Sequence, residues 1–108
     1  MAKHARRIAS LMLHTSPLEQ AGIGDAGGMN VYVVESAKRI AASGVAVDIY
    51  TRANKSGLPE KVEIADGVTV RHLEAGPYEG ISKDELPSQI CAMMSSFMHQ
   101  EARLTPRY

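Results

Sequence analysis

The fold of this chain is decided by the stretch Gly24-Asp25-Ala26-Gly27-Gly28-Met29-Asn30, which joins two apolar segments. Residues 8–13 before it predict a short buried strand, and residues 29–43 after it predict an amphipathic helix. Neighbouring glycines at such a junction let the backbone approach a ligand without a Cβ in the way. The first N–H groups of the helix, at the positive end of its dipole, are then open to a phosphate or a hydroxyl-rich ligand.

The rest of the chain extends this junction into an α/β unit. Gly44 is expected to end the helix, and residues 45–51 predict a second strand, so that a βαβ unit with a right-handed crossover results. Apolar alternation on both sides of Asp66-Gly67 predicts a β-hairpin. Helical spacing resumes at Leu86, with Pro87 in the first turn of a second helix.

Each predicted helix is expected to bury an apolar stripe. In the first helix the stripe is expected to hold Val31, Val34, Ala37 and Ala41, flanked by Val33 and Ile40. In the second it is expected to hold Leu86, Ile90, Met93, Met94 and Phe97. Cys91 and Met98 are also expected to be core residues, because neither has a partner that suggests chemistry.

Length and charge limit the function classes. The chain has 108 residues, one domain or part of one, and its 12 basic residues balance 12 acidic residues. This balance, with few aromatic residues, argues against nucleic-acid binding. A single cysteine fits a reducing compartment, no apolar run is long enough to cross a membrane, and no signal peptide is expected. We therefore expect a cytoplasmic location.

The end of the chain predicts a fragment of a larger domain. Residues 104–108 stop in a helix-to-strand connection, with no further strand after the second helix. Parallel sheets are normally covered on both faces by complete βα units. The open sheet edge also predicts poor solubility of this piece in isolation.

Two interpretations of the glycine pair stay open, a ligand cradle and a tight strand-to-helix turn. The known nucleotide-binding motifs do not match this stretch. The chain has no GxxxxGK[ST] motif, and Gly22-x-Gly24-x-x-Gly27 starts too far beyond the strand for a dinucleotide-binding turn.

Four polar residues are candidates for ligand binding, each with a structural alternative. Asp25 either caps the helix or accepts hydrogen bonds from neutral hydroxyl groups, because a carboxylate repels a phosphate. Asn30 can both donate and accept, which suits a polyol. His14 follows the first strand, where open α/β sheets bind their ligands, and Lys83 is either a solvated charge or a cation for an anionic substrate. His4, His72 and His99 show no metal-ligand spacing, so no metal site is assigned.

Five blocks of the sequence together resemble a known family. In chain order they are His14-Thr15-Ser16-Pro17, residues 24–33, Asp48-Ile49-Tyr50-Thr51-Arg52-Ala53, Ala75-Gly76-Pro77-Tyr78-Glu79-Gly80 and Lys83-Asp84-Glu85-Leu86-Pro87. They resemble the amino-terminal part of the D-inositol-3-phosphate glycosyltransferases of actinobacterial mycothiol synthesis. The wider group is the retaining two-domain GT-B glycosyltransferases, which include sucrose-phosphate synthases.

The resemblance implies a fold and a reaction. The fold is α/β, a partial Rossmann-like parallel sheet with a β-hairpin, in which residues 1–108 are the first part of the GT-B acceptor-binding domain and the donor-binding domain is absent. The reaction is transfer of N-acetylglucosamine from UDP-N-acetylglucosamine to 1D-myo-inositol 3-phosphate with retention, without a nucleophilic carboxylate, so no catalytic residue is named. The resemblance also implies a homodimer. It implies no cofactor in this chain and is compatible with a divalent metal in the full-length enzyme.

The resemblance also implies which residues touch substrate. Acceptor-binding positions match His14, Asp25, Ala26, Gly27, Gly28, Met29, Asn30 and Lys83. Donor-binding positions match Gln20, Ala21 and Gly28. Ala21 departs from the expected proline, a change that a backbone contact would survive in a less rigid loop.

The resemblance also implies that the groups that face the diphosphate belong to the donor-binding domain, so the chain alone is expected to be inactive. Three alternatives stay open: another GT-B transferase of the sucrose-phosphate synthase type, a non-catalytic sugar-phosphate-binding module, and a purely structural βαβ fragment.

Overall fold

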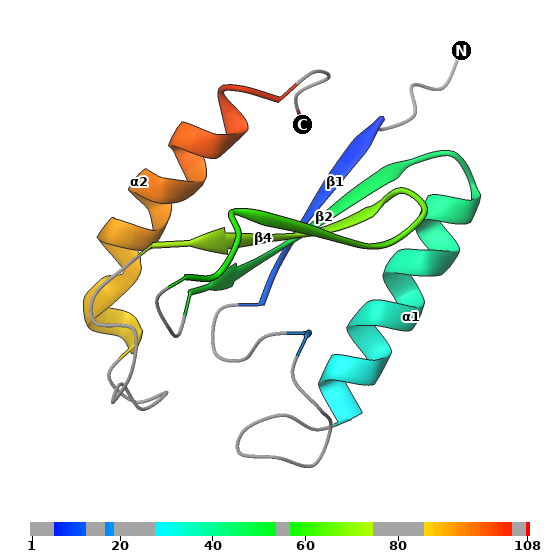
Figure 1. The fold of residues 1–108 in the computed structure, drawn as a ribbon, viewed down its shortest axis with the longest axis horizontal. Helices are drawn as coiled ribbons and strands as arrows, with labels where there is room; N and C mark the ends of the chain where they lie inside the picture. Colours follow the sequence, from blue (N-terminus) through cyan, green and yellow to red (C-terminus); the bar gives the residue numbers. More distant parts are fainter. Residues whose placement is uncertain (1–5, 13–16, 19–27, 54–56, 75–85, 105–107) are drawn as a thin grey trace.

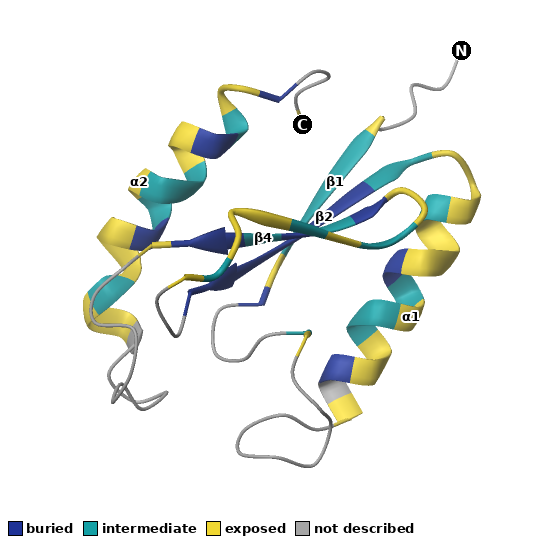
Figure 2. Ribbon diagram, in the orientation of Figure 1, coloured by how far each residue is buried: buried dark blue, intermediate teal, exposed yellow. Residues whose placement is uncertain are grey.

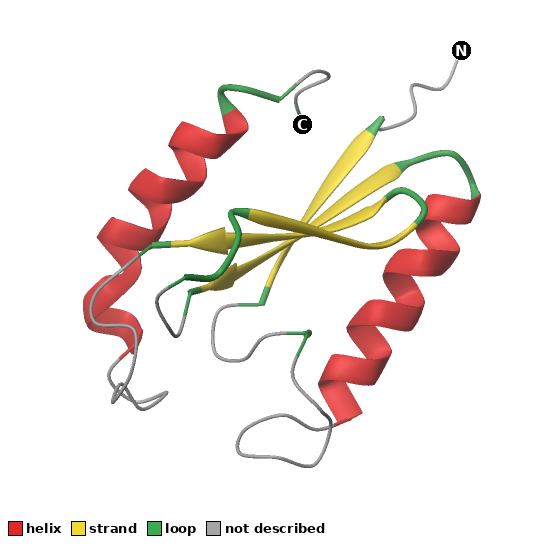
Figure 3. Ribbon diagram, viewed as in Figure 1, coloured by secondary structure: helices red, strands yellow, loops and turns green. Residues whose placement is uncertain are grey.

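The computed structural model describes residues 6–12, 17–18, 28–53, 57–74, 86–104 and 108, and these form one sheet with helices on both sides (Figure 1). The strands are β1 (Arg7–Leu11), β2 (Ala46–Arg52), β3 (Lys61–Ala65) and β4 (Val68–Leu73). The helices are α1 (Gly28–Ala42), the short 3-10 helix η1 (Leu86–Gln89) and α2 (Ile90–Glu101). Figure 3 shows the strands in yellow, with a red helix on either side of them.

The sheet has the order β1-β2-β4-β3. β1 pairs parallel with β2, β2 pairs parallel with β4, and β3 pairs antiparallel with β4 as a hairpin. The predicted βαβ unit and hairpin are both confirmed. Because β1 lies at one end of this order, its outer edge has no strand beside it in the described part of the chain.

Two glycines end elements as the sequence predicts. Gly44 follows α1 with a φ of 97°, and its N–H donates to the carbonyl of Ala41 at 3.0 Å. Gly67 has a φ of 80° in the β3–β4 turn, and a Cβ built there would lie 3.2 Å from the Cβ of Ala41. Both the backbone conformation and the space beside α1 therefore favour glycine at this turn.

The core consists of two layers, one on each face of the sheet, since neighbouring residues of a strand point to opposite faces. Ile49 lies among the residues packed under α1, whereas Tyr50 lies among those under α2. In Figure 2 the central strands β2 and β4 are mostly buried between the two helices. The α1 layer holds Met12, Ala37, Val47, Ile49, Val68 and Val70.

The buried faces of the helices differ in part from the expected ones. Val33, Ala37 and Ala41 face the sheet, while Val31 is 54% exposed because it lies on the outer side of the first turn. In α2 the predicted burial of Met93 is confirmed, but Cys91 and Met98 are exposed rather than buried. The buried face of α2 continues through Phe97, which is partly buried, to Gln100. The prediction that Cys91 and Met98 are core residues was wrong because both lie off this face.

No helix in the described ranges is long and apolar enough to cross a membrane.

Candidate functional site

The ligand site is predicted at the edge of the sheet where the parallel strands end. The ends of these strands are held together by backbone hydrogen bonds, from the N–H of Met12 to the carbonyl of Tyr50 and from the N–H of Ala53 to that of Leu73, both at 2.8 Å. Figure 1 shows that α1 begins beside this edge, after the connection from β1. Open parallel sheets bind their ligands at this edge.

The first turn of α1 contains the three predicted site residues that the structure describes. Gly28 is the first residue of the helix and is exposed, and Met29 follows it in the same turn. Asn30 is only 3% exposed, so its side chain is buried rather than in solvent. The other predicted positions, His14, Gln20, Ala21, Asp25, Ala26, Gly27 and Lys83, lie outside the described residues.

Nothing in the described part of the chain requires glycine at position 28. Gly28 has no positive φ, and a Cβ built there would have no described atom within 4 Å. Glycine is therefore explained here neither by backbone strain nor by packing against described residues. A ligand that approaches the helix start closely, where the first N–H groups point, is a physical reason for this residue.

A second group of polar side chains gathers around Tyr50, on the face of the sheet that α2 covers. The carboxylate of Asp48 is 1% exposed and binds the guanidinium of Arg7 at 2.6 Å and that of Arg71 at 3.0 Å. The hydroxyl of Tyr108 also donates to Asp48 at 2.7 Å, and it lies 2.8 Å from the hydroxyl of Tyr50. These groups come from β1, β2, β4 and the end of the chain, so the cluster ties the sheet together.

Burial and hydrogen bonding shift the pKa values in this cluster. Burial alone would raise the pKa of Asp48, but hydrogen bonds from Tyr108, Arg7 and Arg71 outweigh it and hold this pKa below its ordinary value. Burial raises the pKa of the Tyr108 hydroxyl, and its bonds to Tyr50 and Asp48 raise it further. Burial likewise raises the pKa of Tyr50. All three groups keep one protonation state near neutral pH, which suits a structural role.

One buried cation at the carboxyl edge was not singled out from the sequence. Arg52 ends β2, is 7% exposed, and donates to the carbonyl of Ala53 at 3.2 Å. Burial lowers the pKa of its guanidinium. The sequence does carry a signal that could have identified Arg52, which is a basic residue at the end of a central parallel strand. No group of three or more His, Cys, Asp or Glu side chains that could hold a metal ion occurs among the described residues.

Comparison with known proteins shows to which enzymes the chain is related. The chain is 59% identical over 103 residues to a D-inositol 3-phosphate glycosyltransferase of Kribbella flavida. This match covers 95% of this chain and 24% of that protein. The chain is homologous to the D-inositol 3-phosphate glycosyltransferases. It is 57% identical over 101 residues to the one from Geodermatophilus obscurus, covering 94% of this chain and 22% of the relative. It thus spans about a quarter of the length of these curated relatives. No protein-family model matches the chain.

The fold also matches a solved glycosyltransferase structure. Sucrose-phosphate synthase from Thermosynechococcus elongatus superimposes with a TM-score of 0.85 and 28% identity, over 91% of this chain and 25% of that chain. The chain therefore has the fold of part of a GT-B glycosyltransferase. This confirms the predicted fold class, a parallel α/β sheet with a hairpin.

Proposed function

We propose that this chain supplies the acceptor side of a retaining GT-B glycosyltransferase. The reaction is transfer of N-acetylglucosamine from UDP-N-acetylglucosamine to 1D-myo-inositol 3-phosphate, the first step of mycothiol synthesis in the cytoplasm. The observation that carries the proposal is the 59% identity, over 95% of the chain, to a relative named for inositol 3-phosphate. Residues 1–108 form the first part of the acceptor-binding domain, and a homodimer is the expected assembly.

The residues have complementary roles in this proposal. Lys83 supplies a cation for the acceptor phosphate, while His14, Asp25 and Asn30 exchange hydrogen bonds with the ring hydroxyl groups. The backbone of residues 26–29 approaches the acceptor, and Gly28 and Met29 of this stretch begin α1. Gln20, Ala21 and Gly28 touch the donor sugar nucleotide.

Catalysis on this scheme comes from positioning and from charge stabilisation. The acceptor hydroxyl and the anomeric carbon are held on one face of the donor sugar, and the departing phosphate helps to remove the proton from the acceptor. No protein nucleophile is needed. The groups that stabilise the departing UDP belong to the donor-binding domain, so the chain alone is expected to be inactive.

A second candidate acceptor has one observation in its favour. The 0.85 TM-score to sucrose-phosphate synthase raises fructose 6-phosphate as an acceptor for the same fold. The identity to that protein is 28%, about half of the identity to the inositol 3-phosphate relatives. Inositol 3-phosphate is therefore the preferred acceptor in this proposal.

A chimera tests the proposal on a complete enzyme. Residues 1–108 replace the matching quarter of the Kribbella flavida relative, and sugar transfer from UDP-N-acetylglucosamine is measured by release of UDP. We expect transfer to inositol 3-phosphate at a rate within tenfold of the relative's, and none to fructose 6-phosphate. Transfer to fructose 6-phosphate instead would favour the second candidate, and transfer by residues 1–108 alone would contradict their proposed inactivity.

Gly28→Ala in this chimera tests the approach of a ligand to α1. Because a Cβ at this position has no described atom within 4 Å, the unfolding midpoint should stay unchanged. Transfer should fall by about 10- to 100-fold, the equivalent of roughly 1.4–2.8 kcal/mol, if substrate lies against the helix start. Lys38→Ala, on the exposed side of the same helix, is the matched control and should keep full activity. Equal activity of both variants would remove the start of α1 from the substrate site.

A further inference from the structure

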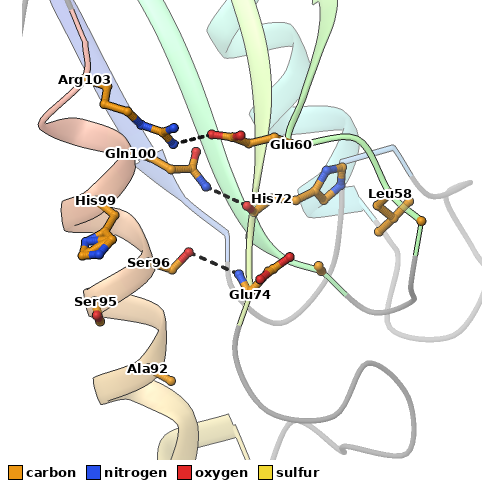
Figure 4. Close-up of a pocket in the computed structure, with 12 residues that line it drawn as sticks. Leu58, Glu60, His72, Glu74, Ala92, Ser95, Ser96, His99, Gln100 and Arg103 are labelled. Atoms are coloured by element: carbon orange, nitrogen blue, oxygen red, sulfur yellow. Dashed lines mark hydrogen bonds and ion pairs between the residues drawn. The ribbon is translucent and has the colours of Figure 1, made fainter.

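A cavity of about 560 Å³ lies on the other side of the sheet from α1 (Figure 4). One wall is a face of α2 with the turn that follows it, and the other is formed by the end of β4 with the segment that leads into β3. Its lining is mostly polar and includes Glu60, His72, Glu74, Ser96, Gln100 and Arg103. The start of α1, where the proposed acceptor site begins, lies on the opposite face of the sheet from α2, although Ala53 and Glu74 of the lining follow the strands at the same carboxyl edge.

Gln100 carries a hydrogen-bonding atom that the protein leaves unused. Its side chain is 6% exposed, and its amide nitrogen donates to the carbonyl of His72 at 2.8 Å. Since a carbonyl only accepts, this bond fixes the orientation of the amide. The Oε1 atom is then a buried acceptor without a hydrogen-bond partner among the described residues. A buried unpaired acceptor is costly, and a donor brought by a ligand would satisfy it.

His72 borders the same space with its backbone rather than with its ring. It is 5% exposed, and its Nδ1 lies 2.7 Å from the carbonyl of Pro59. Figure 4 shows the ring on the side of the strand away from α2, whereas the carbonyl of His72 accepts from Gln100. Among the described residues of the lining, the unused buried acceptor is therefore the Oε1 of Gln100.

The charges of the lining favour a cation. Arg103 is neutralised by Glu60 at 2.6 Å. The backbone N–H of Glu74 donates to Ser96, but its carboxylate has no ion-pair partner in the described ranges. The acidic and basic side chains of the lining, Glu60, Glu74 and Arg103, thus sum to one net negative charge. This surplus opposes an anion, and the described residues hold no cluster suited to a metal ion.

We propose that this cavity binds an organic cation, the ammonium or guanidinium head of a small amine or of a basic side chain. Such a head carries several N–H donors and no acceptor, which matches the unused Oε1 of Gln100 and the carboxylate of Glu74. Its charge balances that of the lining. The chemistry is the same whether the head belongs to a free metabolite or to a partner protein.

Titration of the protein with agmatine, followed by NMR or calorimetry, tests the proposal. We expect saturable binding with a Kd in the millimolar range or below, and no binding of the neutral analogue N-butylurea. Glu74→Gln should weaken agmatine about fivefold, since one charged contact on an exposed carboxylate is lost. Glu63→Gln on β3 removes an equal, exposed charge outside the cavity and should leave the Kd unchanged.

Further measurements distinguish a free amine from a partner protein as the source of the cation, and they include results that would overturn the proposal. A peptide with one arginine that binds more tightly than agmatine would indicate a protein partner, whereas tighter agmatine would indicate a free amine. Gln100→Met keeps the side-chain volume and should weaken either ligand further, provided that its unfolding midpoint shows a folded protein. Equal binding of N-butylurea, equal effects of Glu74→Gln and Glu63→Gln, or no binding of any cation would overturn the proposal.

Discussion

Asp48→Ala is expected to lower the free energy of unfolding by about 3–5 kcal/mol, because it leaves buried charges without their counter-ion. The carboxylate is 1% exposed and binds Arg7 at 2.6 Å and Arg71 at 3.0 Å, and these side chains are themselves only 15% and 12% exposed. Tyr108 would lose its acceptor as well. Urea unfolding followed by circular dichroism measures the loss.

Matched variants separate the buried cluster from a general effect of charge. Glu35→Ala removes an exposed carboxylate that pairs with Lys38 at 3.6 Å on α1, and it should cost less than about 0.5 kcal/mol. A similar loss in both variants would show that the Asp48 cluster contributes no more than a surface pair.

The dependence on pH follows from the direction of the Asp48 pKa. This pKa is lower in the folded protein than its ordinary value of 3.8, so the ionised carboxylate contributes stability above that value. The contribution is lost as the pH falls through the folded pKa. The stability difference between wild type and Asp48→Asn should thus be constant from pH 7 to about 5 and shrink below pH 4.

Much of the fold could be predicted because local patterns decide it. Apolar strands, a glycine after α1 at position 44, and the turn at Asp66-Gly67 each restrict the backbone directly. The exposed position of Val31 could not be predicted as easily, since its neighbour Val33 is equally apolar. Which of them faces the sheet depends on how α1 docks, and that is a tertiary property.

The polar clusters were harder to predict than the apolar core. Asp48 lies between the apolar residues Val47 and Ile49 of β2, and its partners are 41, 23 and 60 residues away along the chain. Gln100 gave a usable signal, because it lies seven residues after Met93 on the face that the helix buries. For the acceptor site the sequence indicated the start of α1, and the structure describes only Gly28, Met29 and Asn30 of it.

Tyr50→Ala is expected to cost about 3–5 kcal/mol and to loosen α2 from the sheet. The ring is fully buried and, with Leu73 and Met93, makes up the buried core under this helix. It meets the ring of Phe97 edge-on, with centroids 4.7 Å apart. Truncation leaves a cavity at the centre of the contact between α2 and the sheet. Hydrogen exchange of the α2 amides should therefore accelerate more than that of α1.

Two tyrosine variants control for this effect. Tyr50→Phe keeps the ring and loses only the hydroxyl that lies 2.8 Å from Tyr108, so it should cost about 1 kcal/mol. Tyr32→Ala removes a ring that is 72% exposed on α1 and should be close to neutral. Equal acceleration of exchange in both helices would mean that Tyr50 stabilises the domain as a whole. Selective acceleration in α2 would mean that this helix, with the cavity it borders, can move independently of the layer under α1.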